Sequence, residues 1–217
     1  MSMQSYTHLA LPGSPGSPLL FLFHGTGGNE EQLVSIGREL LPGAAIVAPR
    51  GDVSEFGAAR FFRRTGEGVY DMDDLATRSA KMAAFVKAHR DAAKPAAMIG
   101  LGYSNGANIL ASVVFAEPDL FDAAVLMHPL IPFEPEIDGD LAGKRLLITA
   151  GRRDPICPPS LTSRLEAYLH AAKADVTVEW HEGGHELRPN EIEAARKFLD
   201  ARHDVEDSLF PSFTGRA

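Results

Sequence analysis

The sequence predicts an α/β fold, a three-layer sandwich with a mostly parallel central sheet and helices on both faces. Short apolar runs suited to buried central strands alternate with runs at helical spacing, and no internal repeat breaks the alternation. The 217 residues, 45% hydrophobic and 23% charged, suit a globular domain that buries a core without disulfides. We expect a single domain over residues 1–202 and an irregular tail over residues 203–217.

The elements follow from apolar spacing and from residues that start helices. Acidic Asp73 and Asp74 open one helix where the helix dipole favours negative charge, and Pro158 and Pro159 fit the start of another. The predicted strands cover residues 19–23, 44–48, 98–101, 123–127, 146–149 and 176–180. The predicted helices cover residues 30–41, 73–93, 105–116, 160–172 and 191–201.

Residues 50–72 have no clean period, and we expect them to form the only lid, a minimal one. A loop of this length in a compact domain is usually functional or disordered, and its aromatic residues argue against disorder. We predict that Phe61 and Phe62 supply an apolar pocket wall and that Arg63 binds a carboxylate. The alternative is a surface loop whose aromatic side chains pack beneath it.

Charge and cysteine content exclude some classes of partner. The formal net charge of −8 and the lack of a basic patch argue against nucleic acid and anionic membranes. Cys157 is the single cysteine and cannot form an internal disulfide, and the early apolar run over residues 19–23 is too short to span a bilayer. We expect a cytoplasmic protein without membrane insertion that acts on a small molecule; whether it forms a homodimer stays open.

The strongest chemical signal is the pentapeptide Gly102-Tyr-Ser-Asn-Gly106 between a predicted strand and a predicted helix. In this context G-x-S-x-G forms a sharp turn that exposes its serine above the sheet. The glycines let the backbone bend tightly, and the amide of Asn105 lies at a helix N-terminus. We predict that Ser104 is a nucleophile.

A serine nucleophile needs a histidine base that is oriented by a carboxylate. Asp154 and His185 each follow a predicted parallel strand, so both should lie at the same sheet edge as Ser104. His181 is the less favoured base, because it ends its strand whereas His185 follows two glycines. The less favoured acids are Asp138, Asp140 and Asp175.

A glycine-rich turn, His24-Gly-Thr-Gly-Gly28, follows the first predicted core strand. Such a turn brings a main-chain N–H close to the site, and we assign this N–H to Thr26. With the amide of Asn105 it would form an oxyanion hole, in which one donor is typically worth ~3 kcal/mol in the transition state.

At these stretches the sequence resembles the α/β-hydrolase fold, and within it the phospholipase/carboxylesterase family that includes acyl-protein thioesterases. The matching pieces are residues 24–28, residues 102–106, Asp154 within Gly-Arg-Arg-Asp-Pro, and His185 within Gly-Gly-His. They keep the family's order over nearly the whole chain. The resemblance implies a Ser104–His185–Asp154 triad and hydrolysis of carboxylic esters without a metal. Thioesterase relatives usually have Ser-Gln where this chain has Ser104-Asn105, so ester or thioester preference stays open.

No cofactor or metal site is predicted. His181-Glu-Gly-Gly-His185 matches the zinc-protease pattern H-E-x-x-H, but two glycines inside a helix would cost ~2 kcal/mol. Residues 25–28 lack the third glycine of a dinucleotide fingerprint and no P-loop follows. Cys157, among prolines, is expected to be a packing residue, and His128 either a pocket-wall or a turn residue.

The sequence therefore predicts a serine carboxylesterase for small to medium carboxylic esters. The alternatives are an acyl thioesterase or lysophospholipase with the same triad, and a binding module that keeps the fold without catalysis.

Overall fold

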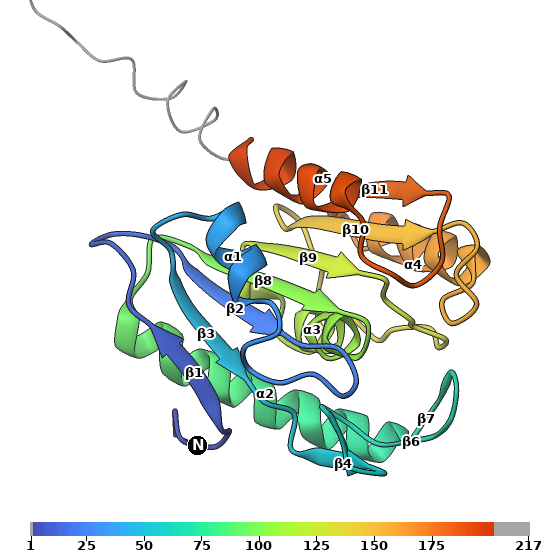
Figure 1. Ribbon diagram of the computed structural model, residues 1–217, viewed down its shortest axis with the longest axis horizontal. Coiled ribbons are helices and arrows are strands. Elements are labelled where there is room, and N and C mark those ends of the chain that lie inside the picture. Colours follow the sequence, from blue (N-terminus) through green and yellow to red (C-terminus); the bar gives the residue numbers. More distant parts are fainter. Residues whose placement is uncertain (1, 202–217) are drawn as a thin grey trace, which may run out of the picture.

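The computed structural model describes residues 2–201, built on a seven-stranded sheet in the order β1-β3-β2-β8-β9-β10-β11 (Figure 1). Neighbouring strands are parallel except β1 and β3, which are antiparallel, so the predicted mostly parallel sheet is confirmed. The strands are β1 (His8–Leu11), β2 (Leu19–Phe23), β3 (Ala45–Pro49), β8 (Met98–Tyr103), β9 (Ala123–Met127), β10 (Arg145–Gly151) and β11 (Asp175–His181).

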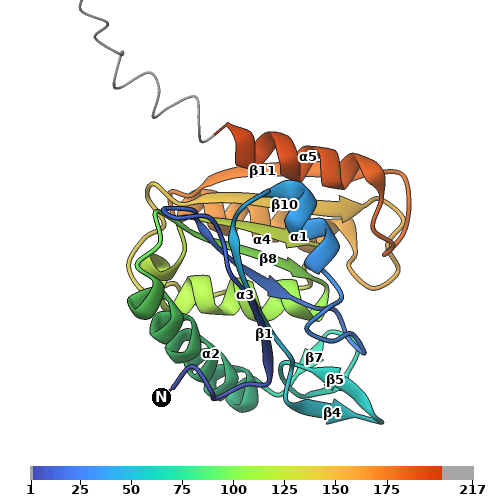
Figure 2. The ribbon, with the colours of Figure 1, turned by 60° about the vertical axis from the view of Figure 1, so that its left-hand side comes forward.

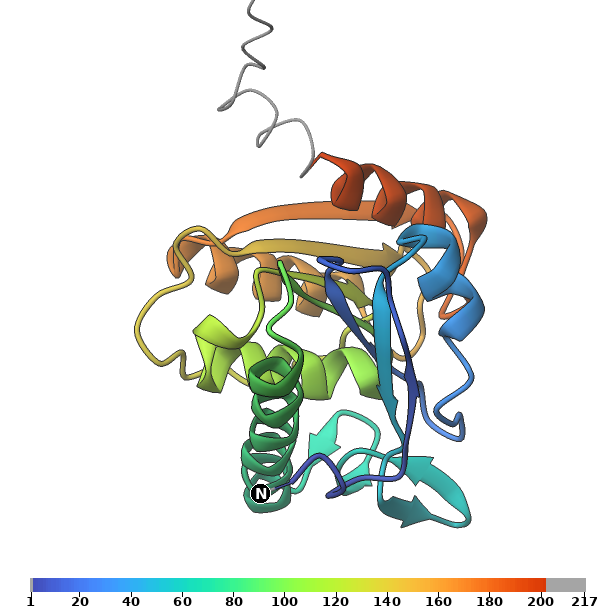
Figure 3. The same cartoon turned by 90° about the vertical axis from the view of Figure 1, so that its left-hand side faces the viewer.

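Helices cover both faces of the sheet, as Figures 2 and 3 show. The helices are α1 (Val34–Leu40), α2 (Met72–Ala93), α3 (Asn105–Ala116), α4 (Pro159–Ala171) and α5 (Pro189–Asp200), with a 3-10 turn at Pro118–Leu120. Side chains alternate along β2: Phe21 and Phe23 pack on the side of α2, α3 and α4, whereas Leu20 and Leu22 pack on the side of α1 and α5. Burial on both faces explains why the central strands are continuous apolar runs.

The parallel strands bring distant parts of the sequence to one edge of the sheet. The arrowheads of β8, β9, β10 and β11 all point to the right in Figure 1. The loops after β2, β8, β9, β10 and β11 therefore share this edge, where α/β proteins build their sites.

Residues 50–71 form two small hairpins rather than one loop. They are β4 (Val53–Glu55) with β5 (Ala58–Arg60), and β6 (Arg64–Gly66) with β7 (Val69–Tyr70). The first turn has positive φ at Phe56 (50°) and Gly57 (88°), the pattern of a tight type I′ hairpin. Strands of two or three residues are too short to show a period of two.

Two further differences lie near the N-terminus. The edge strand β1 was not predicted, because it is only partly buried and has no continuous apolar run. The first helix begins at Val34 rather than Glu30, because Asn29 caps a turn there with a hydrogen bond from the Glu31 amide to its Oδ1 (3.0 Å). The predicted tail over residues 203–217 lies outside the described residues.

Over residues 2–201, no helix combines the length and apolar character that crossing a membrane requires.

Candidate active site

Ser104 lies at a strained turn between β8 and α3. Its φ is 52° and its ψ −117°, a conformation that a serine adopts only when the surrounding structure enforces it. A Cβ at Gly106 would lie 2.0 Å from the carbonyl oxygen of Phe23, and a Cβ at Gly102 would lie 2.5 Å from that of Gly106. Both flanking positions therefore require glycine, and the turn holds Ser104 above the sheet edge.

The structure brings Ser104, His185 and Asp154 into one hydrogen-bonded chain. His185 Nε2 lies 2.9 Å from Ser104 Oγ, and His185 Nδ1 lies 2.7 Å from Asp154 Oδ2. Ser104 lies in the turn after β8, Asp154 in the loop after β10 and His185 in the loop after β11. In a serine catalytic triad with this geometry, the carboxylate fixes the tautomer of the histidine and the histidine accepts the serine proton.

Close backbone packing holds the two supporting loops together. A Cβ at Gly151 would lie 2.1 Å from the carbonyl oxygen of Gly184, so the loops after β10 and β11 approach because residue 151 has no side chain. On the other side, the Tyr103 hydroxyl donates a hydrogen bond to the His185 carbonyl at 2.7 Å. The His185 ring is thus positioned from both sides.

Asp154 is ionised in this setting. Its side chain is fully buried, which opposes the charge, but hydrogen bonds from His128 and His185 to Oδ2 outweigh burial. The amides of Ile156 and Cys157 donate to Oδ1 at 2.8 and 2.9 Å. Together these contacts hold the pKa of Asp154 well below its usual range.

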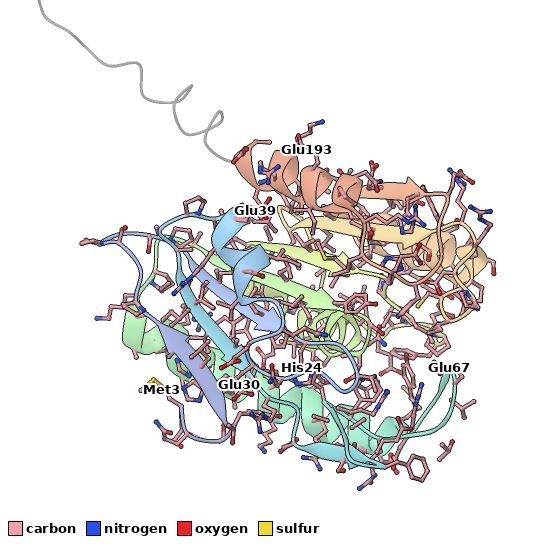
Figure 4. All side chains as sticks on the ribbon, in the orientation of Figure 1. Met3, His24, Glu30, Glu39, Glu67 and Glu193 are labelled. Carbon is pink, nitrogen blue, oxygen red and sulfur yellow. The ribbon has the colours of Figure 1, made fainter. Side chains whose placement is uncertain are left out.

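The predicted oxyanion turn is held rigid by His24, which Figure 4 labels near the end of β2. His24 Nε2 accepts a hydrogen bond from the Gly51 amide at 2.9 Å, so Nδ1 carries the proton and donates to the Gly25 carbonyl at 2.7 Å. Burial lowers the pKa of His24, which keeps this neutral form. The Gly28 amide closes the turn on the Gly25 carbonyl, with φ 78° at Gly27, and Thr26 then faces the cavity.

Asn105 is the first residue of α3, where backbone N–H groups have no partner within the helix. Its side-chain Oδ1 accepts a hydrogen bond from the Phe61 amide at 2.8 Å. Its Nδ2 is buried and has no hydrogen-bond partner among the described residues. Thr26 and Asn105 line the same cavity as Ser104, as the predicted oxyanion hole requires.

The cavity beside Ser104 has a volume of about 310 Å³, at the lower end of the range for ligand pockets. The hairpin segment supplies one wall, and Glu67 is labelled at its tip in Figure 4. The lining residues are Thr26, Arg60, Arg64, Glu67, Tyr70, Tyr103, Ser104, Asn105, Asn108, Leu130, Ile156 and His185.

The predicted wall residues lie elsewhere. Phe61 and Phe62 are buried in the core, with Phe61 against His24 and Phe62 against Tyr70. The exposed Arg63 side chain pairs with acidic residues of the α2 start rather than facing the cavity. The segment does supply one wall of the cavity, but through Arg60, Arg64, Glu67 and Tyr70. Residues 61–63 connect the two hairpins, and there the two phenylalanines are buried in the core instead of facing the cavity.

His128 is neither a pocket wall nor a turn residue at the surface. Its side chain is 0% exposed and lies behind Asp154, with Nδ1 2.9 Å from Asp154 Oδ2. The two histidines, 128 and 185, therefore share one carboxylate oxygen. His181, the less favoured base, has Nε2 3.5 Å from His128 Nε2 in the same buried group.

Two further members of this buried group were not predicted from the sequence. Glu191 and Thr149 are joined by a hydrogen bond of 2.5 Å from the threonine hydroxyl to the carboxylate. Glu191 sits in the first turn of α5, where an acid is expected for helix capping alone. Complete burial is what distinguishes Glu191 from an ordinary capping glutamate, and burial is not visible in the sequence.

Two groups within residues 2–201 have metal-ligating atoms close together: His128 with His181 and Glu191, and His128 with Asp154 and His185. In both groups the ring nitrogens and carboxylate oxygens already contact one another as hydrogen-bond or ion-pair partners. The zinc-protease geometry is not formed, since His181 ends β11 and His185 lies in the following loop instead of both lying on one helix.

Comparison with known proteins places the chain in a family of hydrolases. Residues 10–194 match the Dienelactone hydrolase family. The MhqD protein of Bacillus subtilis (strain 168), provisionally named a hydrolase, is 41% identical over 182 residues, which are 83% of this chain and 91% of MhqD.

Solved structures share the fold at high similarity. The protein Atu2452 of unknown function from Agrobacterium tumefaciens str. C58 is 58% identical, with a TM-score of 0.88 over 93% of this chain and 98% of that one. The Bacillus cereus carboxylesterase is 37% identical, with a TM-score of 0.87 over 91% of this chain and 94% of that one. The predicted resemblance to α/β-hydrolase carboxylesterases is confirmed, and the chain is a hydrolase that belongs to the dienelactone hydrolase family.

Proposed function

We propose that the chain is a serine carboxylesterase that hydrolyses small to medium carboxylic esters through an acyl-enzyme on Ser104. The observation that carries this proposal is the hydrogen-bonded chain from Ser104 Oγ through His185 to Asp154 at a cavity. The Bacillus cereus carboxylesterase, 37% identical, supports an ester as the substrate class.

In the acylation step, Ser104 Oγ forms a bond to the acyl carbon and its proton passes to His185 Nε2. The developing oxyanion is stabilised by the amides of Thr26 and Asn105. When the intermediate collapses, the bond to the alkoxy oxygen breaks and His185 gives its proton to the leaving alcohol. Asp154 stays ionised and stabilises the imidazolium throughout.

Deacylation repeats these steps with water. His185 takes a proton from the water molecule as its oxygen attacks the acyl carbon, and returns that proton to Ser104 Oγ as the acyl bond breaks. The products are a carboxylic acid and the free enzyme. In both steps His185 alone carries the proton between Ser104, the leaving alcohol and water.

Cavity size limits the substrate. With about 310 Å³ beside Ser104, the site suits short and medium acyl groups better than long ones. Arg60 and Arg64 in the wall both contact Glu55, at 3.5 and 2.9 Å, so their charges are partly offset. This wall is polar, which favours compact esters over long alkyl chains.

Turnover of p-nitrophenyl esters of increasing acyl length, acyl thioesters and lysophospholipids tests the proposal, together with labelling by a fluorophosphonate probe. We expect short esters to react fastest, and Ser104→Ala to lose both labelling and at least about 10⁴-fold in kcat. Ser112→Ala is the matched control, because this serine lies on α3, the helix that follows Ser104, and its hydroxyl donates a hydrogen bond to the Asn108 carbonyl.

The outcomes separate the alternatives. Faster turnover of thioesters or lysophospholipids would favour those substrate classes with the same residues. Wild-type protein that neither labels nor turns over any ester would favour a binding module.

A further inference from the structure

Behind the active site, Asp154 contacts a buried polar group that the proposed reaction does not use. We name it the His128 cluster: His128 after β9, Thr149 on β10, His181 at the end of β11 and Glu191 on α5. All four side chains are almost completely buried. His128 Nδ1 lies 2.9 Å from Asp154 Oδ2, and His128 Nε2 lies 2.9 Å from Glu191 Oε1.

The His128 ring is thus held between two carboxylates. A carboxylate oxygen 2.9 Å from an unprotonated ring nitrogen would be repulsive, so a proton lies at each of these two contacts. Glu191 already accepts hydrogen bonds from the Thr149 hydroxyl on Oε1 and from the Arg188 amide on Oε2, as an ionised carboxylate does. This pattern places both protons on His128, whose positive charge then lies between two negative ones.

The protonation of His181 is consistent with this arrangement. Its Nδ1 accepts a hydrogen bond from the Gly183 amide at 2.9 Å, so Nε2 carries the proton. That nitrogen lies 3.4 Å from Glu191 Oε2 and 3.5 Å from His128 Nε2. Because both ring nitrogens carry a proton in this arrangement, each faces an oxygen of Glu191 and neither accepts from the other. His181 therefore completes the contacts of Glu191 as a neutral ring.

We propose that His128 is a positioning residue, protonated at neutral pH, which orients the Asp154 carboxylate for His185 and sets the pH range over which His185 acts as base. The inference rests on the proposed function, because it assigns a purpose to a neighbour of that triad. His128 touches neither the cavity nor Ser104 and acts only through Asp154.

The geometry supports both parts of this role. His128 and His185 bind the same oxygen, Oδ2, while two backbone amides hold Oδ1, so the carboxylate cannot rotate without losing one of these bonds. The rings of His128 and His185 are 5.1 Å apart between centroids. At that distance a charge on one ring opposes a second charge on the other.

Other ionisable groups pack around these two rings. Tyr103 lies against both, at 6.0 and 5.6 Å between centroids, and Cys157 Sγ is 3.8 Å from His185 Nδ1. Burial raises the pKa of Tyr103 to about 12 and also raises that of Cys157, so both stay neutral. Burial opposes the charge on His128, but contacts with Asp154 and Glu191 outweigh it and raise its pKa to about 9. The surrounding charges are therefore those of Asp154, Glu191 and, on the adjoining loop, the paired Glu186 and Arg188.

The variant His128→Asn tests the proposal. An asparagine amide nitrogen takes the place of Nδ1 and can still donate to Asp154, but the positive charge is gone. Asparagine also tolerates the φ of 52° at this position. We expect the acidic limb of the kcat/KM profile to move to higher pH by about one unit or more, with about tenfold lower kcat/KM on that limb.

His181→Asn is the matched control. It removes a buried histidine of the same cluster that does not contact Asp154, and it keeps an acceptor for the Gly183 amide. We expect its acidic limb to stay where the wild-type limb lies. A limb that moves equally in both variants, or in neither, would overturn the proposal.

A second measurement does not depend on any variant folding. Nitrogen-15 NMR of histidine-labelled wild-type protein at pH 7 should show one ring, assigned to His128, with both nitrogens protonated. A single protonated nitrogen on His128, or one equivalent of zinc bound to the purified protein, would overturn the inference. Turnover retained by Ser104→Ala would instead contradict the proposed function and leave the NMR result untouched.

Discussion

The two sides of Asp154 place a histidine on the same oxygen atom but in opposite environments. On the cavity side, the His185 side chain is 17% exposed and faces a serine hydroxyl. On the interior side, the His128 side chain is 0% exposed and faces a second carboxylate. A neutral partner leaves His185 able to exchange a proton, whereas a second carboxylate fixes the proton on His128. The partner on the far side of the ring, rather than the residue type, therefore distinguishes the proposed base, His185, from His128.

The largest effect should come from the atom that joins the two sides. Asp154→Asn replaces one acceptor oxygen by an NH₂ group and removes the negative charge. The side chain then cannot accept hydrogen bonds from both rings and from both backbone amides, and His185 loses the carboxylate that would select its tautomer. We expect kcat to fall by about 10³–10⁴-fold, measured on the preferred ester.

Asp138→Asn is the control for that change, because Asp138 was a competing candidate acid and is exposed. Wild-type activity in Asp138→Asn and a loss in Asp154→Asn would sharpen the comparison. Full activity in Asp154→Asn would contradict the role proposed for Asp154 between the two histidines.

On the interior side, the charge on His128 should make the free energy of unfolding depend on pH. The pKa of His128 is about 9 in the folded protein and about 6.5 in an unfolded chain. The stabilisation that protonated His128 contributes is therefore fully present below about pH 6.5 and is lost as pH rises through about 9. We expect the free energy of unfolding, from urea titrations, to fall by up to about 3 kcal/mol across this window.

The same titrations on His128→Asn isolate this contribution, because Cys157 and the tyrosines are present in both proteins. The variant should be less stable at pH 6.5 and lose less stability by pH 9. Parallel curves for the two proteins would mean that His128 carries no extra proton.

The smallest effect should come from the side chain of Thr26 on the cavity side. Its hydroxyl accepts a hydrogen bond from Arg60 Nη1 at 2.7 Å, while the proposed oxyanion donor is its backbone amide. We expect Thr26→Ala to lower kcat/KM by less than about tenfold, whereas loss of an oxyanion donor costs about 10²–10³-fold. A loss as large as the latter would assign the chemistry to the hydroxyl.

The sequence predicted well what depends on local pattern. Continuous apolar runs such as Leu19–Phe23 mark buried parallel strands, and glycines 102 and 106 mark a turn that other residues cannot form. Strand order in the chain then predicted that Ser104, Asp154 and His185 share an edge. The structure of residues 50–72 could not be predicted in this way, because strands of two or three residues show no period. Phe61 and Phe62 could not be assigned either, because an apolar side chain fits a pocket wall and a core equally well.

By itself, then, the amino-acid sequence determined the parallel sheet, the serine turn and the edge where its partners gather, because backbone sterics and apolar burial act within a few residues. Only the tertiary structure decided that His128 lies between Asp154 and Glu191, residues 26 and 63 positions away along the chain. Protonation depends on which charges burial brings within about 3 Å, and that distance is set by packing between elements rather than by neighbours in the chain.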